Sequence, residues 1–262
     1  MTKKVFIAIC VAGIIQSSVV LLYSQAKNNV EQLIQDMGLL EYAPDENASL
    51  EDLLSLIRSD AWAMVSQNQK ERIKAAFLKQ LRHGVGLVGR VESEEGRRHL
   101  MLLGQISAEL KDPLMVPILV DGVASAYFKD ALVAIGRPAI SMLVKRFGDK
   151  TMAGTAIGKR AILDILGQMG ISVAGGRKDV HELLAKACED KNARVRMSAV
   201  RALGEIGDDT FIPMLEKIAL NDSGFYDTTI ATSSSRSYFV RDTAIGSVEK
   251  IKKRISNVQN KR

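Results

Sequence analysis

Residues 192–218 read NARVRMSAVRALGEIGDDTFIPMLEKI, and this stretch decides the fold class. In its first half, apolar residues recur at helical spacing, which places them on one face of a helix. A glycine and two aspartates, Gly207 to Asp209, interrupt that helix, and a second apolar series follows from Ile212 to Ala219. The stretch therefore predicts two antiparallel helices joined by a tight turn. The apolar positions of the first helix are Val195, Ala199, Ala202, Leu203 and Ile206.

The same pattern occurs several times along the chain. Each copy has a Leu-Gly or Ile-Gly step near the end of its first helix, and the glycines lie 32, 31 and 37 residues apart. Recurrence near one period, with helical periodicity around each copy, is typical of an α-solenoid, in which stacked hairpins cover one another's apolar faces. The steps are Leu103-Gly104, Ile135-Gly136, Leu166-Gly167 and Leu203-Gly204.

The last segment of the chain predicts a helix that caps such a stack. Its apolar residues form one stripe, and the opposite face carries Lys250, Lys253 and Arg254. A terminal helix that buries one side and exposes the other closes a repeat array. The basic residues near the chain end predict a solvated face, with attraction to an anionic membrane surface as the alternative. The stripe consists of Val240, Ala244, Val248, Ile251, Ile255 and Val258.

Residues 190–220 resemble the HEAT-repeat family, in the short form described as phycobilisome-lyase-like. The resemblance is weaker over residues 97–189 and faint over 27–90. It implies an all-α fold, an α-solenoid of antiparallel helix pairs (a HEAT-like α-α superhelix). A divergent helical cap is expected at residues 27–92, followed by repeats and the capping helix over 93–262. The matching residues are Asp190, Val195-Arg196, Ala199, Ala202-Leu203-Gly204, Ile206-Gly207-Asp208, Pro213 and Leu215.

The resemblance also implies a set of structural residues. In the family, an aspartate and an arginine six positions later tie neighbouring repeats together, and Asp190 and Arg196 have this spacing. We expect Arg196 to hold the repeats together rather than to bind a ligand. Asp149 would need an arginine at Thr155, so the series of pairs is expected to be incomplete. The predicted structural residues are Asp190, Arg196, Gly204, Asp208 and Pro213.

The first 26 residues have the layout of a secretory signal. Two lysines precede an apolar run from Val5 to Tyr23, and Ser24 to Ala26 supplies small residues before a cut. Residues 1–26 are therefore predicted to be a signal peptide, and the protein to be exported to a periplasmic, extracellular or envelope location. The alternative is a retained anchor that tethers the chain to an envelope assembly, because residues 5–23 roughly match a bilayer core.

Charge and cysteine content bear on two possibilities, nucleic-acid binding and stabilisation by a disulfide. Removal of the signal takes two of the 36 basic residues and leaves 34 against 30 acidic ones, a mild excess that does not argue for nucleic-acid binding. Cys188 is then the only cysteine, so the mature chain cannot form an internal disulfide. Its place on the apolar side of a predicted helix favours a buried thiol.

Motifs that suggest chemistry fail in their context. Gly84 to Gly89 has the spacing of a dinucleotide fingerprint but follows a helix, so we expect a flexible helix connection there. His181-Glu182 lacks the second histidine of a zinc-protease motif, because position 185 is Ala185. We therefore expect no catalytic, cofactor-binding or metal-binding residue and no cofactor. The resemblance leaves an enzyme or metal protein of lyase or hydroxylase type as an alternative.

Two irregular segments are better candidates for function. Residues 221–237, NDSGFYDTTIATSSSRS, place a polar loop between helices that otherwise join within a few residues, and disorder is its alternative reading. Ile171 to Asp179 lengthens another turn, for which a solvated turn is favoured over an anion site. We expect a non-catalytic protein-interaction scaffold whose partner is another protein. The candidate partner-binding residues are Phe225, Tyr226, Arg236 and Tyr238.

Overall fold

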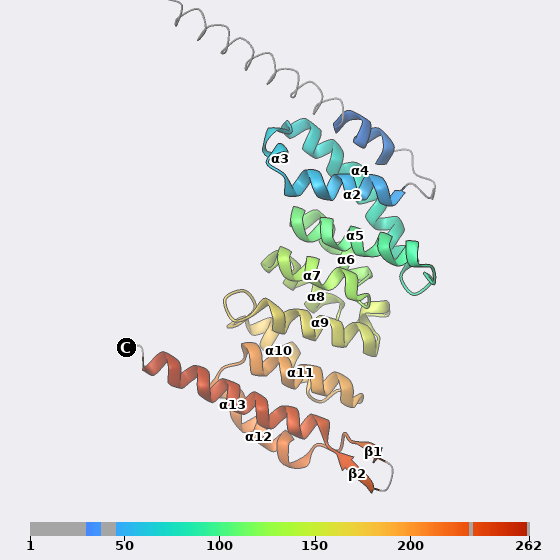
Figure 1. The fold of residues 1–262 in the computed structure, drawn as a ribbon. Helices are drawn as coiled ribbons and strands as arrows, with labels where there is room; N and C mark the ends of the chain where they lie inside the picture. The colour runs from blue at the N-terminus through green and yellow to red at the C-terminus, as the bar shows by residue number, and fades with distance from the viewer. Residues whose placement is uncertain (1–29, 38–45, 231–232, 261–262) are drawn as a thin grey trace, which may run out of the picture. The chain divides into compact units, whose positions relative to one another are not determined.

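The computed structural model describes residues 30–37, 46–230 and 233–260 (Figure 1). The predicted signal peptide or anchor, residues 1–26, lies outside them. None of the described helices is both long enough and apolar enough to cross a membrane. By its internal contacts the chain divides into two compact units: residues up to Gly84 together with Val91–Ile106, and Val85–Arg90 together with Ser107 onward.

The first unit is helical. α4 buries Ile73, Phe77 and Leu81 at a spacing of four residues, so one face of this helix forms the centre of the unit's core. A side chain at Gly84 would collide with Leu103, which explains the glycine by close helix packing. The flexible connection predicted at Gly84 to Gly89 is helical as far as Leu87, because α4 continues to that residue. The elements are a helix at 30–37, α2 (Glu46–Arg58), α3 (Ala61–Met64), α4 (Gln67–Leu87) and most of α5 (Glu94–Leu110).

The second unit is a stack of helix pairs and confirms the predicted α-solenoid. α7, α9, α11 and α13 pack side by side in chain order, and α8 contacts both α6 and α10 in a second layer (Figure 1). The helices are α6 (Val116–Asp121), α7 (Ala126–Ile135), α8 (Arg137–Arg146), α9 (Ala156–Met169), α10 (Lys178–Ala187), α11 (Ala193–Ile206), α12 (Ile212–Asn221) and α13 (Phe239–Gln259). Three short 3-10 turns are described as well: η1 (Pro113–Met115) before α6, η2 (Met152–Gly154) between α8 and α9, and η3 (Asp209–Phe211) between α11 and α12.

Small residues determine how closely the stacked helices approach. A Cβ atom added to Gly204 in α11 would lie 2.6 Å from the Oγ atom of Ser247 and 3.0 Å from its Cα atom. Ser247 in turn donates a hydrogen bond of 2.9 Å from Oγ to the carbonyl oxygen of Val200. Gly204 thus allows a close contact between α11 and α13 that any larger side chain would disturb.

Polar residues fix where the helices of the stack begin. The side chains of Thr155 and Asn192 accept backbone N–H bonds in the first turns of α9 and α11. Asp208 does the same for the N–H group of Thr210 before α12, at 3.0 Å. Pro213 occupies the first turn of α12, where its missing N–H group costs nothing.

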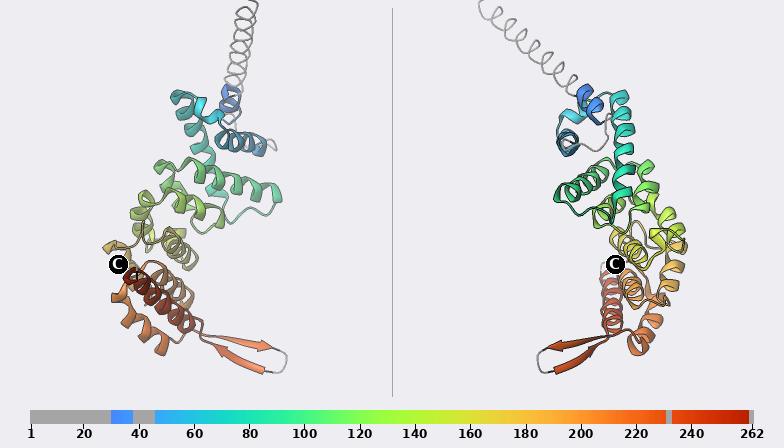
Figure 2. Two further views of the ribbon diagram at one scale, coloured as in Figure 1. Left: turned by 60° about the vertical axis from the view of Figure 1, so that its left-hand side comes forward. Right: turned by 90° about the vertical axis from the view of Figure 1, so that its right-hand side faces the viewer.

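A β-hairpin interrupts the helical pattern between α12 and α13. β1 (Tyr226–Ile230) and β2 (Ser233–Ser237) pair antiparallel, with Tyr226 opposite Ser237 and Asp227 opposite Arg236. Figure 2 shows this hairpin extending away from α12 and α13. The segment was expected to be an irregular loop, because its serines hide the strand preference of the Tyr, Thr and Ile residues in β1.

α13 is longer than the other first helices of the stack, and α11 covers only part of its length. The predicted stripe is buried from Val240 to Ile251, whereas Val258 near its end is 54% exposed. The prediction for Arg254 was wrong: this residue is half-buried, and its guanidinium donates to the carbonyl oxygens of Gly204 and Glu205 at 3.0 and 3.1 Å. Its charge neutralises the carboxyl end of α11 rather than facing solvent.

Candidate functional site

Each of the last three junctions between helix pairs is built around an aspartate. In all three, the carboxylate accepts the backbone N–H of the residue two positions further on, a side-chain turn that orders the chain between helices. The recurrence gives the three junctions one local geometry. The pairs are Asp149 with Thr151 at 2.9 Å, Asp190 with Asn192 at 2.9 Å, and Asp222 with Gly224 at 2.7 Å.

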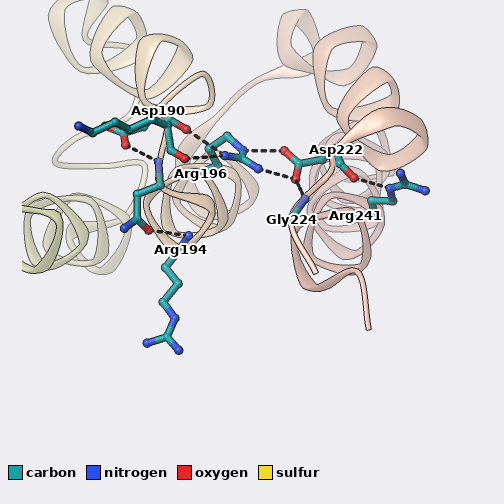
Figure 3. Close-up of polar contacts among 8 residues, drawn as sticks. Asp190, Arg194, Arg196, Asp222, Gly224 and Arg241 are labelled. Atoms are coloured by element: carbon teal, nitrogen blue, oxygen red, sulfur yellow. Dashed lines mark hydrogen bonds and ion pairs between the residues drawn. The ribbon is translucent and has the colours of Figure 1, made fainter. Parts of the chain in front are cut away.

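A basic residue from the first helix of a pair binds the aspartate that follows the second helix. Lys159 of α9 contacts Asp190 at 2.7 Å. Arg196 of α11 makes two hydrogen bonds to the carboxylate of Asp222, of 2.7 Å from Nε and 2.9 Å from Nη2 (Figure 3). A two-pronged arginine–carboxylate contact fixes both distance and orientation. We call this series of contacts the junction ladder.

Arginines also link the last two junctions to the next helix. Arg196 donates from Nη1 to the carbonyl oxygen of Asp190 at 3.0 Å, and Arg241 of α13 donates from Nε to that of Asp222 at 2.6 Å (Figure 3). The spacing of Asp190 and Arg196 therefore acts through a backbone carbonyl, since the carboxylate of Asp190 is taken by Lys159. Lys159 and Arg241 were not singled out in the sequence analysis.

At the earlier junction the ladder takes another form. Asp149 finds no arginine at position 155 and pairs instead with Arg146 of α8 at 3.0 Å. Arg146 also contacts Asp121, the last residue of α6, at 3.0 Å. At this junction a cation of α8 therefore ties the end of α8 to the end of α6.

We call the pair of Arg196 and Asp222 the last rung of the ladder, and hydrogen bonding keeps both of its groups charged although they are buried. The side chains of Arg196 and Asp222 are only 14% and 8% exposed. Burial alone would raise the pKa of the Asp222 carboxyl, but hydrogen bonds from Arg196 and from the N–H of Gly224 outweigh it and lower that pKa. The same hydrogen bond raises the pKa of the Arg196 guanidinium. Both groups are therefore ionised at neutral pH.

The last rung also holds both ends of the hairpin. Asp222 lies just before β1, and Arg241 lies just after β2. The Arg241 guanidinium sits 4.2 Å from the ring centroid of Tyr238, a cation–π distance, and the Phe225 and Tyr238 rings lie 5.9 Å apart. We call Asp222, Phe225, Tyr238 and Arg241 the hairpin base.

The structure brings only some of the predicted partner-binding residues together. Phe225 and Tyr238 contact each other at the hairpin base, and Phe225 is 43% exposed. Tyr226 begins β1, and Arg236 lies in β2 opposite Asp227. Asp222 and Arg241 were missed, although Asp222 follows Asp190 by 32 residues, which is one repeat period.

His, Cys, Asp and Glu side chains are the groups that could bind a metal ion or act as a nucleophile. Among the described residues no three His, Cys, Asp or Glu side chains are placed to hold a metal ion. Cys188 is buried, and burial raises the pKa of its thiol to about 12. The charged groups of the ladder bind one another, so their role in this arrangement is to hold the helices in position.

The stacked pairs and the junction ladder define the chain as a helical-repeat protein. A family model of HEAT repeats matches residues 153–236, which contain α9 to α12 and nearly all of the hairpin. This stretch is therefore similar to an array of HEAT repeats. A search of curated proteins gave no match to the chain.

Proposed function

We propose that this protein is an exported, non-catalytic scaffold that binds another protein, and that the hairpin is its main contact. The observation that carries the proposal is the hairpin base. The last rung of the junction ladder, Arg196 and Asp222, is continued by Arg241, so the repeat array holds the one two-stranded segment that leaves its described helical layers.

This arrangement favours binding for a physical reason. An isolated two-stranded hairpin is marginally stable in water, so it needs support from the body of the protein to keep one conformation. Because the repeat array holds the hairpin in one conformation before a partner binds, less conformational entropy is lost on binding. β1 and β2 pair only with each other among the described strands, so each offers a backbone edge to an extended segment of a partner. Phe225 adds a partly exposed aromatic ring at the base.

Affinity capture from the native cell envelope tests the role of the hairpin. The bait is the full chain, compared with a variant in which residues 226–237 are replaced by a short Gly/Ser linker. We expect one partner in near-stoichiometric amount with the full chain and its loss with the variant, while both keep the same helical circular dichroism. Equal recovery by both baits would contradict the proposal for the hairpin. Stoichiometric iron or zinc in the purified protein would contradict the non-catalytic assignment.

Export is tested at the amino terminus. A cleaved signal peptide predicts a mature chain that begins at Lys27, which intact-mass measurement of the native protein detects. Full-length mass in the membrane fraction would instead support the tethered alternative through residues 5–23. Full-length mass in the soluble interior of the cell would exclude both.

A further inference from the structure

A second surface, separate from the hairpin, is the outer face of α12. Six of the ten residues of this helix are apolar, yet Leu215 alone is buried. The neighbouring second-layer helices bury more of their residues, α8 three and α10 four. α12 packs mainly on α13 and η3, because the described stack contains no further helix pair that could cover its other side.

Four exposed side chains of α12 lie together on one face. They are spaced by three, one and three positions, which places them on the side of the helix opposite Leu215. Leu220 among them is 74% exposed, more than any other large apolar side chain that the structure describes. The exposed residues of α10, in contrast, are all charged. We call these four residues the α12 face: Pro213, Glu216, Lys217 and Leu220.

The α12 face is complementary to itself. Along the helix its residues are apolar, acidic, basic and apolar, so the order of charges reverses when the helix is read backwards. Two copies of α12 that run antiparallel about a two-fold axis between residues 216 and 217 would therefore match. Glu216 of each copy would face Lys217 of the other, and Leu220 of each copy would face Pro213 of the other.

Charge also distinguishes this arrangement from others. Lys217 is exposed and makes no ion pair with any described residue. Glu216 contacts Lys252 at 3.0 Å but remains 53% exposed, so it can accept a second cation. A parallel arrangement of the two helices would place Glu216 beside Glu216 and Lys217 beside Lys217, and like charges in contact oppose association.

We propose that two copies of this protein associate through the α12 face as an antiparallel helix pair. One helix face buries less area than a standard interface, so the dimer is weak and depends on protein concentration. The inference goes beyond the partner binding proposed for the hairpin. A dimer displays two hairpins, which raises the effective affinity for a partner that carries two binding sites.

Analytical ultracentrifugation of the purified native protein tests the association. We expect a monomer at about 1 µM and mostly dimer at about 1 mM, the range of a weak interface. A species of monomer mass at every concentration would overturn the proposal.

Matched variants locate the contact. Leu220→Gln should weaken the dimer at least about tenfold, because each dimer loses this apolar contact twice. Leu114→Gln changes a leucine of η1 that is 69% exposed, and it should leave the dimer constant within about twofold. Both variants should keep the helical circular dichroism of the unchanged protein. Equal effects of the two substitutions would contradict the location.

A charge exchange tests the two-fold geometry. Lys217→Glu and Glu216→Lys should each weaken self-association several-fold, because like charges then meet at two places in the dimer. An equimolar mixture of these two variants should associate better than either alone, because opposite charges face each other again in the mixed dimer. A mixture that associates no better than its components would overturn the antiparallel arrangement.

The hairpin variant separates self-association from partner binding. Replacement of residues 226–237 should leave the dimer constant within about twofold, since the α12 face is intact. Loss of the dimer in that variant would assign the contact to the hairpin and reject the α12 face. A chain that stays monomeric, and whose Leu220→Gln variant no longer captures another protein, would make this face a partner site and reject self-association.

Discussion

At the scale of single residues, we expect the ion pair of Arg196 and Asp222 to stabilise the fold more than an exposed pair does. Arg196 and Asp222 are mostly buried and joined by two hydrogen bonds, whereas Lys252 and Glu216 are 57% and 53% exposed and joined by one. Exposed pairs contribute little to stability, because water screens them and their side chains lose entropy on pairing. A buried pair that loses one member leaves an uncompensated charge.

A double-mutant cycle should show this difference. We expect a coupling free energy of about 1.5–3 kcal/mol between Arg196→Met and Asp222→Asn, because the two hydrogen bonds are charge-assisted and shielded from water. The control pair Lys252→Met and Glu216→Gln should couple by less than about 0.5 kcal/mol. Urea unfolding of the seven proteins, namely the unchanged protein, the four single variants and the two double variants, measures both. Equal coupling in the two cycles would mean that the ladder does not stabilise the stack.

The acid limb of the stability profile tests the same rung. The folded-state pKa of Asp222 lies below its ordinary value of 3.8, so its ionisation stabilises the fold fully above that value. This contribution is lost as the pH falls through the lower folded-state pKa. Asp222→Asn should therefore be less stable than the unchanged protein at pH 6, by about 2 kcal/mol, and the difference should shrink toward pH 2. A difference that is constant with pH would show that the charge of Asp222 is not involved.

At the scale of elements, glycine positions show how closely the helices are packed. Gly204 has Ser247 directly opposite, but nothing lies within 4 Å of a Cβ atom added to Gly246. Both residues are inside helices, so an alanine improves helix propensity equally at the two positions. Only at Gly204 does the new methyl group meet a neighbour.

Alanine at these two positions should have opposite effects. Gly204→Ala should lower the free energy of unfolding by about 1–2 kcal/mol, because crowding against Ser247 exceeds the gain in propensity. Gly246→Ala should raise it by about 0.5–1 kcal/mol. Thermal and urea unfolding of the two variants measure the effects. A stabilising Gly204→Ala would contradict the close contact between α11 and α13.

The elements also show what the sequence could and could not predict. The helix pair α11–α12 followed from its apolar periodicity and from the break at Gly207, because local patterns determine both. The hairpin was missed because both strands are short and β2 is serine-rich, and because their support comes from Asp222 and Arg241, which lie outside the strands.

At the scale of the whole molecule, the described helices form a repeat array, and a β-hairpin projects from it between α12 and α13. Each helix pair covers its neighbours, and the junction ladder ties the last three junctions to their helices. Such an array displays side chains and loops at fixed spacing, which suits the recognition of another protein.

Site-specific photo-crosslinking in the producing cells tests the central claim most directly. A photoreactive amino acid replaces Phe225 at the hairpin base, and a matched variant carries it at Leu114, which is 69% exposed in η1. We predict one crosslinked partner, in the envelope or outside the cell, from position 225 and none from position 114. Crosslinks of equal yield from both positions, or none from position 225 while the protein is intact and folded, would contradict the account.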